Sequence, residues 1–177
     1  MRCRLAEVDD AAAMLAIYNP EVIETSVSFD LVPRSLDDQI EWILAHRGTH
    51  PCIVAINDED DVGELGARGE RILGFASVST FRERPAYATT VENSVYVHRN
   101  ARGRHAGSSL LRELIRLCGE SGFHSLIARI VGENRPSIIL HENCGFTLVG
   151  TEIEVGRKHA RWLDVVEYQY VFSDDVR

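Results

Sequence analysis

The segment "VHRNARGRHAGSSLLREL", from Val97 to Leu114, constrains the fold of this 177-residue chain more than any other stretch. A strand-like apolar segment ends here in a basic turn that contains glycine, and an amphipathic helical pattern follows directly. The first turn of a helix exposes backbone N–H groups that lack helical acceptors, and the helix dipole adds positive potential. The sequence therefore predicts a strand–turn–helix unit with an anion site, with phosphate as the usual guest.

Two familiar phosphate-binding motifs do not fit this turn. The chain has no G-x-x-x-x-G-K-[ST] segment, which excludes a P-loop nucleotide hydrolase. It also lacks G-x-G-x-x-G with an acidic partner downstream, so a dinucleotide-binding fold is a poor match. Taken alone, the turn is also compatible with a purely structural role.

Hydrophobic periodicity predicts a mixed α/β domain over residues 1–177, with six or seven strands and about four helices. We expect the first helix to end at Pro20. Ser35 and Asp38 form a capping-box pair at the start of the second helix. The buried stripe of that helix is predicted to comprise Leu36, Ile40, Ile43 and Leu44. The predicted strands are 2–8, 51–57, 71–80, 91–98, 124–131, 146–156 and 162–172. The predicted helical segments are 9–23, within which Pro20 is expected to end the helix, 35–48, 108–122 and 133–146.

Composition excludes several classes of partner. A net charge of −8 and a pI near 5.3 disfavour binding to nucleic acid or to an anionic membrane surface. No apolar run approaches the roughly 20 residues of a membrane span, and the N-terminus does not resemble a signal peptide. The four cysteines lack zinc-ligand spacing, so we expect buried free thiols, a cytoplasmic protein and no metal. The acidic segment 58–70 is predicted to be a solvated hairpin loop.

The order strand, "RGRHAG", helix, strand, "ENRPS", helix, "GF", strand resembles the GCN5-related N-acetyltransferases. The segments "IYNPEVIETSVSFD", "ENSVYVH", "NRPSIILHENCGF" and "GRKHARWLDVVEYQ" are similar to the phosphinothricin and methionine sulfoximine acetyltransferase branch. This resemblance covers nearly the whole chain. It implies a largely antiparallel sheet that splays at one parallel pair, acetyl-coenzyme A (acetyl-CoA) as co-substrate, and a homodimer.

The resemblance also implies which residues bind the coenzyme. The backbone of Val95, Tyr96 and Val97 would pair with the pantetheine arm. The pyrophosphate loop would comprise Arg102, Gly103, Arg104, His105, Ala106, Gly107 and Ser108. His105 departs from the usual glycine, and it either contacts a phosphate or faces solvent without a role. Asn134 and Ser137 resemble residues that contact the coenzyme arm, although both are also ordinary helix-capping residues.

Two residues carry the chemistry that the resemblance implies. Glu92, just before "SVYV", corresponds to the general base that accepts the proton of the amine. The alternative for Glu92 is an ion pair with Arg82 or Arg84. His141 lies where many members have the acid that protonates the leaving thiolate, and its alternative is a structural role.

The substrate pocket is expected to present cations and hydrogen-bond donors, because a phosphinothricin-like amino acid carries a carboxylate and a second oxygen-rich group. Exposed basic residues are usually only solvated, and a tryptophan can instead pack in a dimer. The candidate substrate-binding residues are Phe29, Arg82, Arg84, Tyr87, Lys158, Arg161 and Trp162.

We therefore expect an enzyme that acetylates the amine of a small amino-acid-like substrate by direct attack. Acetylation of a protein N-terminus or a polyamine is a second hypothesis, although the basic segment "FRERPAY" suits an anionic substrate better. A sensor that binds an acyl-coenzyme A without catalysis is a third, and the presence of both Glu92 and His141 argues against it.

Overall fold

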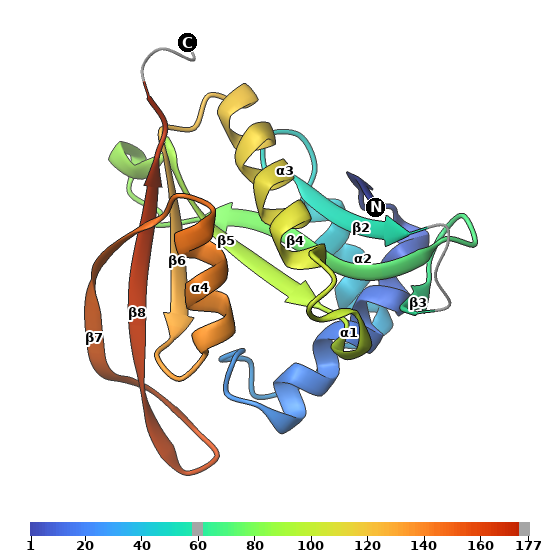
Figure 1. Ribbon diagram of the computed structural model, residues 1–177, viewed down its shortest axis with the longest axis horizontal. Helices are drawn as coiled ribbons and strands as arrows, with labels where there is room; N and C mark the ends of the chain where they lie inside the picture. Colours follow the sequence, from blue (N-terminus) through green and yellow to red (C-terminus); the bar gives the residue numbers. More distant parts are fainter. Residues whose placement is uncertain (58–61, 174–177) are drawn as a thin grey trace.

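The computed structural model describes residues 1–57 and 62–173, which form one mixed sheet with helices on both faces (Figure 1). The strand order is β1-β2-β4-β5-β6-β8-β7, and β3 pairs with β4. The strands are β1 Arg2–Leu5, β2 Cys52–Asn57, β3 Glu64–Leu65, β4 Arg71–Thr80, β5 Thr90–Val97, β6 Ser125–Val131, β7 Thr147–Lys158 and β8 Arg161–Val171. The helices are α1 Ala11–Glu24, α2 Leu36–Ala45, α3 Ala106–Glu120 and α4 Arg135–Asn143, with 3-10 turns at Val8–Asp10, Pro85–Tyr87 and Arg99–Ala101.

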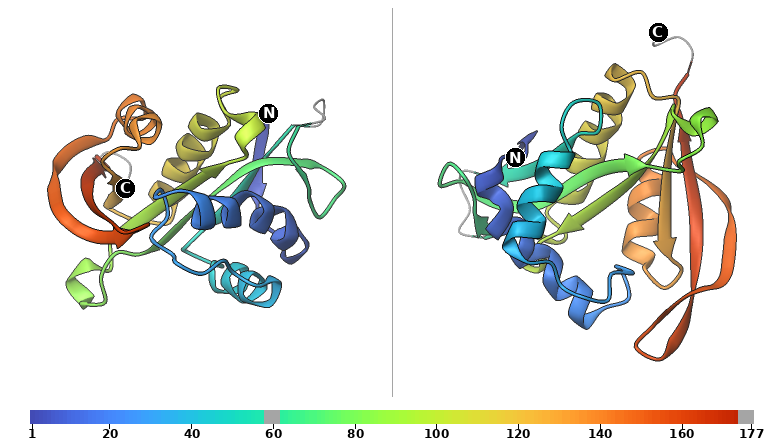
Figure 2. Two further views of the ribbon diagram at one scale, coloured as in Figure 1. Left: turned by 90° about the horizontal axis from the view of Figure 1, so that it is seen from below. Right: turned by 180° about the vertical axis from the view of Figure 1, so that it is seen from behind.

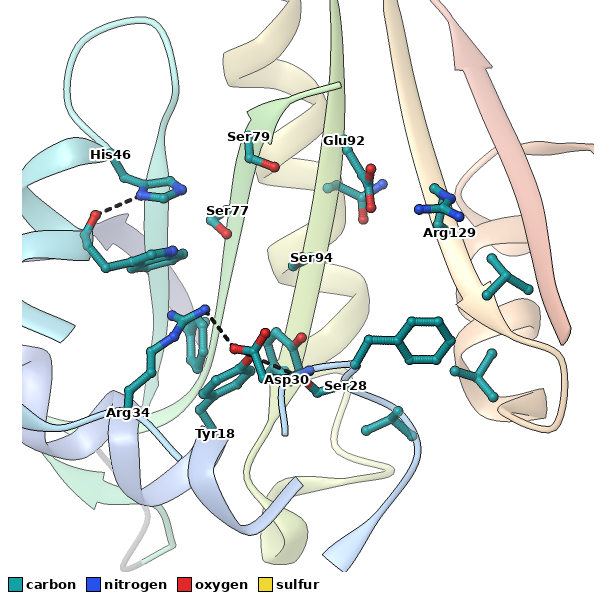
Figure 3. A pocket seen from close by; sticks show the side chains of 18 residues that line it. Tyr18, Ser28, Asp30, Arg34, His46, Ser77, Ser79, Glu92, Ser94 and Arg129 are labelled. Carbon is teal, nitrogen blue, oxygen red and sulfur yellow. Dashed lines mark hydrogen bonds and ion pairs between the residues drawn. The ribbon is translucent and has the colours of Figure 1, made fainter. Parts of the chain in front are cut away.

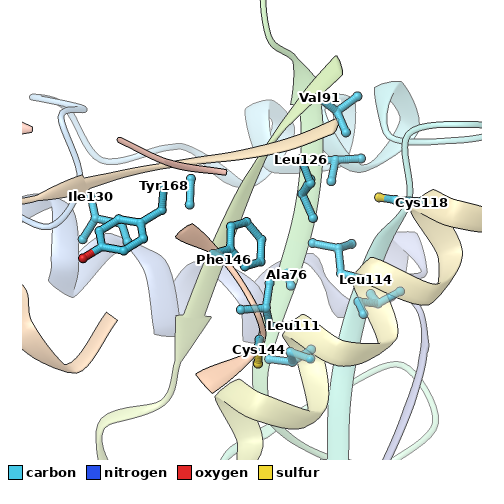
Figure 4. Close-up of a cluster of buried hydrophobic side chains, with 14 of the residues drawn as sticks. Ala76, Val91, Leu111, Leu114, Cys118, Leu126, Ile130, Cys144, Phe146 and Tyr168 are labelled. Carbon is cyan, nitrogen blue, oxygen red and sulfur yellow. The ribbon is translucent and has the colours of Figure 1, made fainter. Parts of the chain in front are cut away.

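The two largest hydrophobic cores hold the layers together. Helices α1 and α2 cover one face of the sheet, and α3 and α4 cover the other (Figure 2). Leu111 and Leu114, on the predicted apolar face of α3, share one core with Ala76 of β4, Leu126 of β6 and Phe146 between α4 and β7 (Figure 4). On the opposite face, Met14 and Ile17 of α1 pack with Val54, Ile72 and Phe75. Both faces of the central strands are therefore buried.

The parallel pair β5–β6 is the point where the sheet opens. All other neighbouring strands are antiparallel. Strands β5 and β6 pair only through Thr90–Ser125, Val91–Leu126 and Glu92–Ile127, and beyond Glu92 they separate while each keeps its outer neighbour. The predicted largely antiparallel sheet with one splayed parallel pair is confirmed, with β3 as an additional short strand.

Three local expectations were wrong. Helix α1 does not end at Pro20 but continues to Glu24, because its last turn buries Glu21 and Val22. This burial outweighs the hydrogen bond that proline cannot donate. In α2, Leu36 and Leu44 are 49% and 43% exposed, because a polar residue, Gln39, occupies the buried face beside Ile43.

The predicted loop 58–70 is the third difference. Residues 58–61 lie outside the described residues, but Glu64 and Leu65 pair with β4 as strand β3. Backbone pairing needs no apolar side-chain pattern, and Gly69 at φ +71° allows the turn back into β4. A two-residue strand of this kind leaves no periodicity in the sequence.

The cysteines follow the prediction. Cys118 and Cys144 are buried free thiols, and burial raises the pKa of the Cys118 thiol to about 12. None of the helices within the described ranges is both long and apolar enough to span a bilayer.

Candidate active site

Strand β5 presents alternate side chains to the two faces of the sheet. Glu92, Ser94 and Tyr96 line a cavity on the α1–α2 face. On the α3–α4 face, Val91 belongs to the core and Val95 packs against it. Asn93 borders the cavity as well, but its amide group contacts His141 of α4 and Ile127 of β6. At the point where β5 and β6 separate, the consecutive side chains of Glu92 and Asn93 therefore make their contacts on opposite faces of the sheet.

The cavity on the α1–α2 face has a volume of about 300 Å³ (Figure 3). Glu92 and Arg129 lie at one end, and Asp30 and Arg34 lie at the other, with serine hydroxyls between them. The remaining lining residues are Tyr18, Val27, Ser28, Phe29, Trp42, His46, Phe75, Ser77, Ser79, Asn93, Ser94, Tyr96, Val131 and Val165. The cavity therefore offers both charges, hydroxyl donors and aromatic walls.

Glu92 is a half-buried carboxylate with the electrostatics of a base. Burial raises its pKa, Glu167 and Glu152 raise it further, and the positive charge of Arg129 opposes the shift. Among the described residues none forms an ion pair with Glu92, and the Arg82 guanidinium instead lies 4.8 Å from the centre of the Phe81 ring. The structure thus disfavours the alternative of a structural Glu92–Arg82 pair.

His141 lies on α4, on the opposite side of β5 from Glu92. Its ring is buried, with the residue 3% exposed, and it meets the Phe146 ring edge-on at 4.9 Å. Nδ1 lies 2.8 Å from the carbonyl oxygen of Ser137, and Nε2 lies 3.0 Å from Oδ1 of Asn93. Burial lowers the pKa of His141, while the Ser137 carbonyl acts in the opposite direction.

The predicted coenzyme strand has an open edge. Val95, Tyr96 and Val97 pair with β4 on one side, and β5 has no pairing with β6 beyond Glu92. An extended chain of amide groups can add to such an edge through backbone hydrogen bonds. The backbone thus fits a pantetheine arm.

The predicted pyrophosphate loop leads directly into α3. His105 adopts a left-handed conformation at φ 65° and ψ 8°, and no side chain caps the helix N-terminus. Gly107 packs closely, since a Cβ there would lie 3.2 Å from the Leu140 side chain. An uncapped helix start of this shape suits a diphosphate.

Arg102 and Asn134 also have structural partners. Arg102 donates to the buried carboxylate of Glu21 at 2.9 Å, and Arg99 donates to the same oxygen at 3.0 Å. Asn134 accepts from the Ser137 N–H at 3.3 Å and so caps α4. These contacts hold Arg102 and Asn134 beyond the ends of β5 and β6, where the two strands have separated. They are compatible with additional contacts to the coenzyme.

Of the predicted substrate residues, Phe29 lines the cavity. Its ring fills the space above Gly156, where a Cβ would lie only 2.3 Å from it. Lys158 is buried and donates to the Ser28 carbonyl at 2.6 Å, so it anchors the segment that carries Phe29.

The other predicted substrate residues lie outside the cavity lining. Arg161 pairs with Glu133, and Trp162 is exposed beneath the Arg157 guanidinium. The connection between β4 and β5 carries the exposed Arg82 and Arg84 together with the half-buried Tyr87.

Sequence reasoning missed most of the cavity wall. The Arg34 guanidinium lies between aromatic rings, 4.4 Å from Tyr18 and 5.0 Å from Trp42, and donates to Asp30 at 3.4 Å. No local sequence pattern predicts this stack, because Tyr18, Arg34 and Trp42 come from three separate segments. Arg129 did leave a signal, since it is the one charged residue in the otherwise apolar stretch "SLIARIV".

The described residues contain no group of three or more His, Cys, Asp or Glu side chains that could hold a metal ion.

Comparisons with known proteins agree with this geometry. The acetyltransferase (GNAT) family profile matches residues 13–146. A phosphinothricin N-acetyltransferase of Streptomyces coelicolor is 36% identical over 161 residues, covering 91% of this chain and 90% of that protein. An L-methionine sulfoximine/L-methionine sulfone acetyltransferase of Pseudomonas paraeruginosa is 36% identical over 167 residues, covering 94% of this chain and 91% of that protein.

A solved structure shows the same fold. The phosphinothricin acetyltransferase of Sinorhizobium meliloti, in complex with acetyl-CoA, superimposes with a TM-score of 0.87 at 33% identity. The match covers 97% of this chain and 88% of that chain. The open parallel strand pair, the uncapped turn before α3 and these similarities lead to one conclusion: the chain belongs to the acetyltransferase (GNAT) family of acyltransferases.

Proposed function

We propose that this enzyme transfers an acetyl group from acetyl-CoA to the primary amine of a small amino acid of the phosphinothricin, methionine sulfoximine or methionine sulfone type. The observation that carries the proposal is the half-buried Glu92 carboxylate at one end of a cavity of about 300 Å³. A cavity of this size suits a small amino acid better than a peptide. The substrates for which the similar proteins are named support the same class.

The coenzyme fits the open edge of β5 and the start of α3. In this proposal the backbone of Val95, Tyr96 and Val97 holds the pantetheine arm, and the N–H groups from Gly103 to Ser108 hold the diphosphate. The bound co-substrate supplies an acetyl group activated as a thioester.

Glu92 and His141 then divide the two proton transfers between the two faces of the sheet. Glu92 accepts the proton that the substrate amine loses as its nitrogen forms the new C–N bond. A raised pKa brings this carboxylate closer to the pH at which it works, which makes it a better general base. His141 provides the proton for the sulfur as the C–S bond breaks.

Charge and hydroxyl groups in the cavity would select the substrate. The Arg129 and Arg34 guanidinium groups suit a carboxylate and the oxygens of a sulfone or phosphinate group. Phe29 would form an apolar wall. Arg82, Arg84, Tyr87, Lys158, Arg161 and Trp162 stay predictions as substrate contacts, as do the homodimer and the cytoplasmic location.

The test is release of free thiol from acetyl-CoA with a panel of amines, run for the unaltered protein, Glu92→Gln and Glu83→Gln. We expect turnover of methionine sulfone, methionine sulfoximine or phosphinothricin, and a 10²–10⁴-fold lower kcat for Glu92→Gln. Glu83→Gln is the matched control, because Glu83 is an exposed glutamate on the connection before β5.

Other outcomes decide against the proposal. Preference for spermidine or a short peptide would indicate the second class of amine acetyltransferase. Coenzyme binding without turnover of any amine would favour a sensor. Unchanged turnover in Glu92→Gln would remove Glu92 from the mechanism.

A further inference from the structure

We propose that Asn93 is a positioning residue: its amide oxygen gives the buried His141 ring an acceptor for a second N–H, so that His141 can hold the proton that the thiolate takes. The catalytic meaning of this inference rests on the proposed function.

The orientation of the Asn93 amide is fixed by β6. Its Nδ2 donates to the carbonyl oxygen of Ile127 at 2.9 Å. Ile127 belongs to the last residue pair before β5 and β6 separate, so this bond spans the point where the strands part. Reversing the amide would set two oxygens against each other, which leaves Oδ1 as the atom that faces His141.

Each nitrogen of the His141 ring therefore faces an acceptor. Nε2 lies 3.0 Å from Oδ1 of Asn93, and Nδ1 lies 2.8 Å from the Ser137 carbonyl. A neutral imidazole has one N–H and satisfies one of these contacts, whereas the protonated ring satisfies both. The hydroxyl of Ser137, 3.4 Å from Nδ1, is at best a long contact.

Burial works against a charged ring, so the second acceptor matters. The neighbours of His141 offer no counter-charge: Asn93 on β5, Ser137 on α4 and the Phe146 ring are all uncharged. The ionisable groups on the adjoining elements are bound elsewhere or face away. Glu142 accepts from Tyr168, Arg112 donates to the Asn143 carbonyl, and Glu92 faces the cavity across the sheet.

Two variants separate this role from a structural one. Asn93→Asp and Asn93→Leu both remove the donor to Ile127, so any effect that comes only from losing that bond is common to both variants. Only the aspartate keeps an acceptor, now charged, next to Nε2. We expect the pKa of His141 to rise in Asn93→Asp and to fall in Asn93→Leu.

The measurement is a pH titration of the His141 ring nitrogens by ¹⁵N NMR in the free protein. The signals are assigned with His141→Gln, and thermal unfolding verifies that each variant folds. In the unaltered protein we expect the ring to gain its second proton before acid unfolding begins. This titration of the unaltered protein needs neither Asn93 variant, so it stands even if the leucine variant does not fold. A ring that stays singly protonated throughout overturns the inference, as do equal shifts in the two variants.

The pH dependence of kcat links the inference to the reaction. In Asn93→Leu, each unit by which the pKa of His141 drops should lower kcat about tenfold. This decrease applies at pH values above the pKa of His141. Opposite NMR shifts with no change in the kcat profile would support the positioning of His141 but overturn its role as the acid. Normal turnover with no NMR difference between the variants would overturn the inference and leave the proposed function standing.

Discussion

At the scale of single residues, the buried Asp10 and the half-buried Glu92 carboxylates have opposite properties because their neighbours differ. Burial acts to raise the pKa of Asp10, but two hydrogen bonds from Arg4, at 2.7 and 2.9 Å, and backbone N–H groups from Ala67 and Glu7 hold it below its usual value. Glu92 has no such donors, and burial raises its pKa. The first carboxylate is a structural anion, and the second is suited to exchange protons.

This difference predicts how stability depends on pH. A carboxylate whose pKa is raised by folding favours the folded state while it is protonated, and this contribution is lost as pH rises through the folded-state pKa. Glu92→Gln should therefore be more stable than the unaltered protein at pH 8, with the gain vanishing near pH 4. Urea unfolding at the two pH values measures this, with the exposed Glu83→Gln as control. A variant that is less stable at pH 8 would show that ionised Glu92 has a stabilising partner.

At the scale of elements, the turn between β5 and α3 depends on one backbone conformation. His105 holds φ 65°, a region that costs most side chains about 1–2 kcal/mol and that histidine tolerates better than β-branched residues. The His105 side chain is exposed. The left-handed conformation at position 105, rather than a contact of the imidazole ring, explains why glycine would fit there.

Two substitutions at this position test that explanation. His105→Gly should keep coenzyme affinity and change stability by less than about 1 kcal/mol, because glycine relieves strain but adds freedom to the unfolded chain. His105→Val should destabilise the fold by about 1–2 kcal/mol and weaken coenzyme binding, since the turn N–H groups would reorient. Unfolding in denaturant and calorimetric titration with acetyl-CoA provide both values. Weaker binding in His105→Gly would instead indicate a direct contact between the ring and a phosphate.

At the scale of the whole molecule, Glu21 connects the two binding regions. It lies in the last turn of α1, where its buried carboxylate accepts from Arg99 and Arg102 near the coenzyme turn. Its other carboxylate oxygen, Oε2, lies 3.3 Å from the Thr25 hydroxyl, at the start of the segment that leads to Phe29, and this hydroxyl also lies 2.7 Å from the Glu21 carbonyl oxygen. The substrate side and the coenzyme side therefore share one buried anion.

Glu21→Gln should disturb both sides. We expect a loss of stability of about 1–3 kcal/mol, because charged hydrogen bonds to a buried carboxylate are removed, together with several-fold weaker coenzyme binding. The control is Glu24→Gln, since Glu24 pairs with Arg99 but its side chain is 57% exposed, against 5% for Glu21. An exposed pair of this kind contributes less than about 1 kcal/mol. Equal effects of the two substitutions in unfolding and titration experiments would contradict the connecting role of Glu21.

Sequence and structure agree where the information is local. The strand–turn–helix unit and the Ser35–Asp38 cap each lie within a short segment, and the structure contains both. The cavity was not predictable in the same way, because Arg34 acquires its role only when folding places it between Tyr18 and Trp42. Asn93 gave no signal either, since its function depends on where β6 leaves β5.

The alternation of β5 has a consequence for how this chain tolerates change in length. Side chains on a strand alternate with a period of two, so inserting one residue within β5, directly before Glu92, would exchange the faces that Glu92 and Asn93 serve. The base would point toward α4, and the partner of His141 would enter the cavity. The exposed connection 81–89 lies immediately before this strand and can change in length without altering the register. Indels in descendants of this sequence should accumulate in that connection, while β5 keeps its length even where its side chains vary.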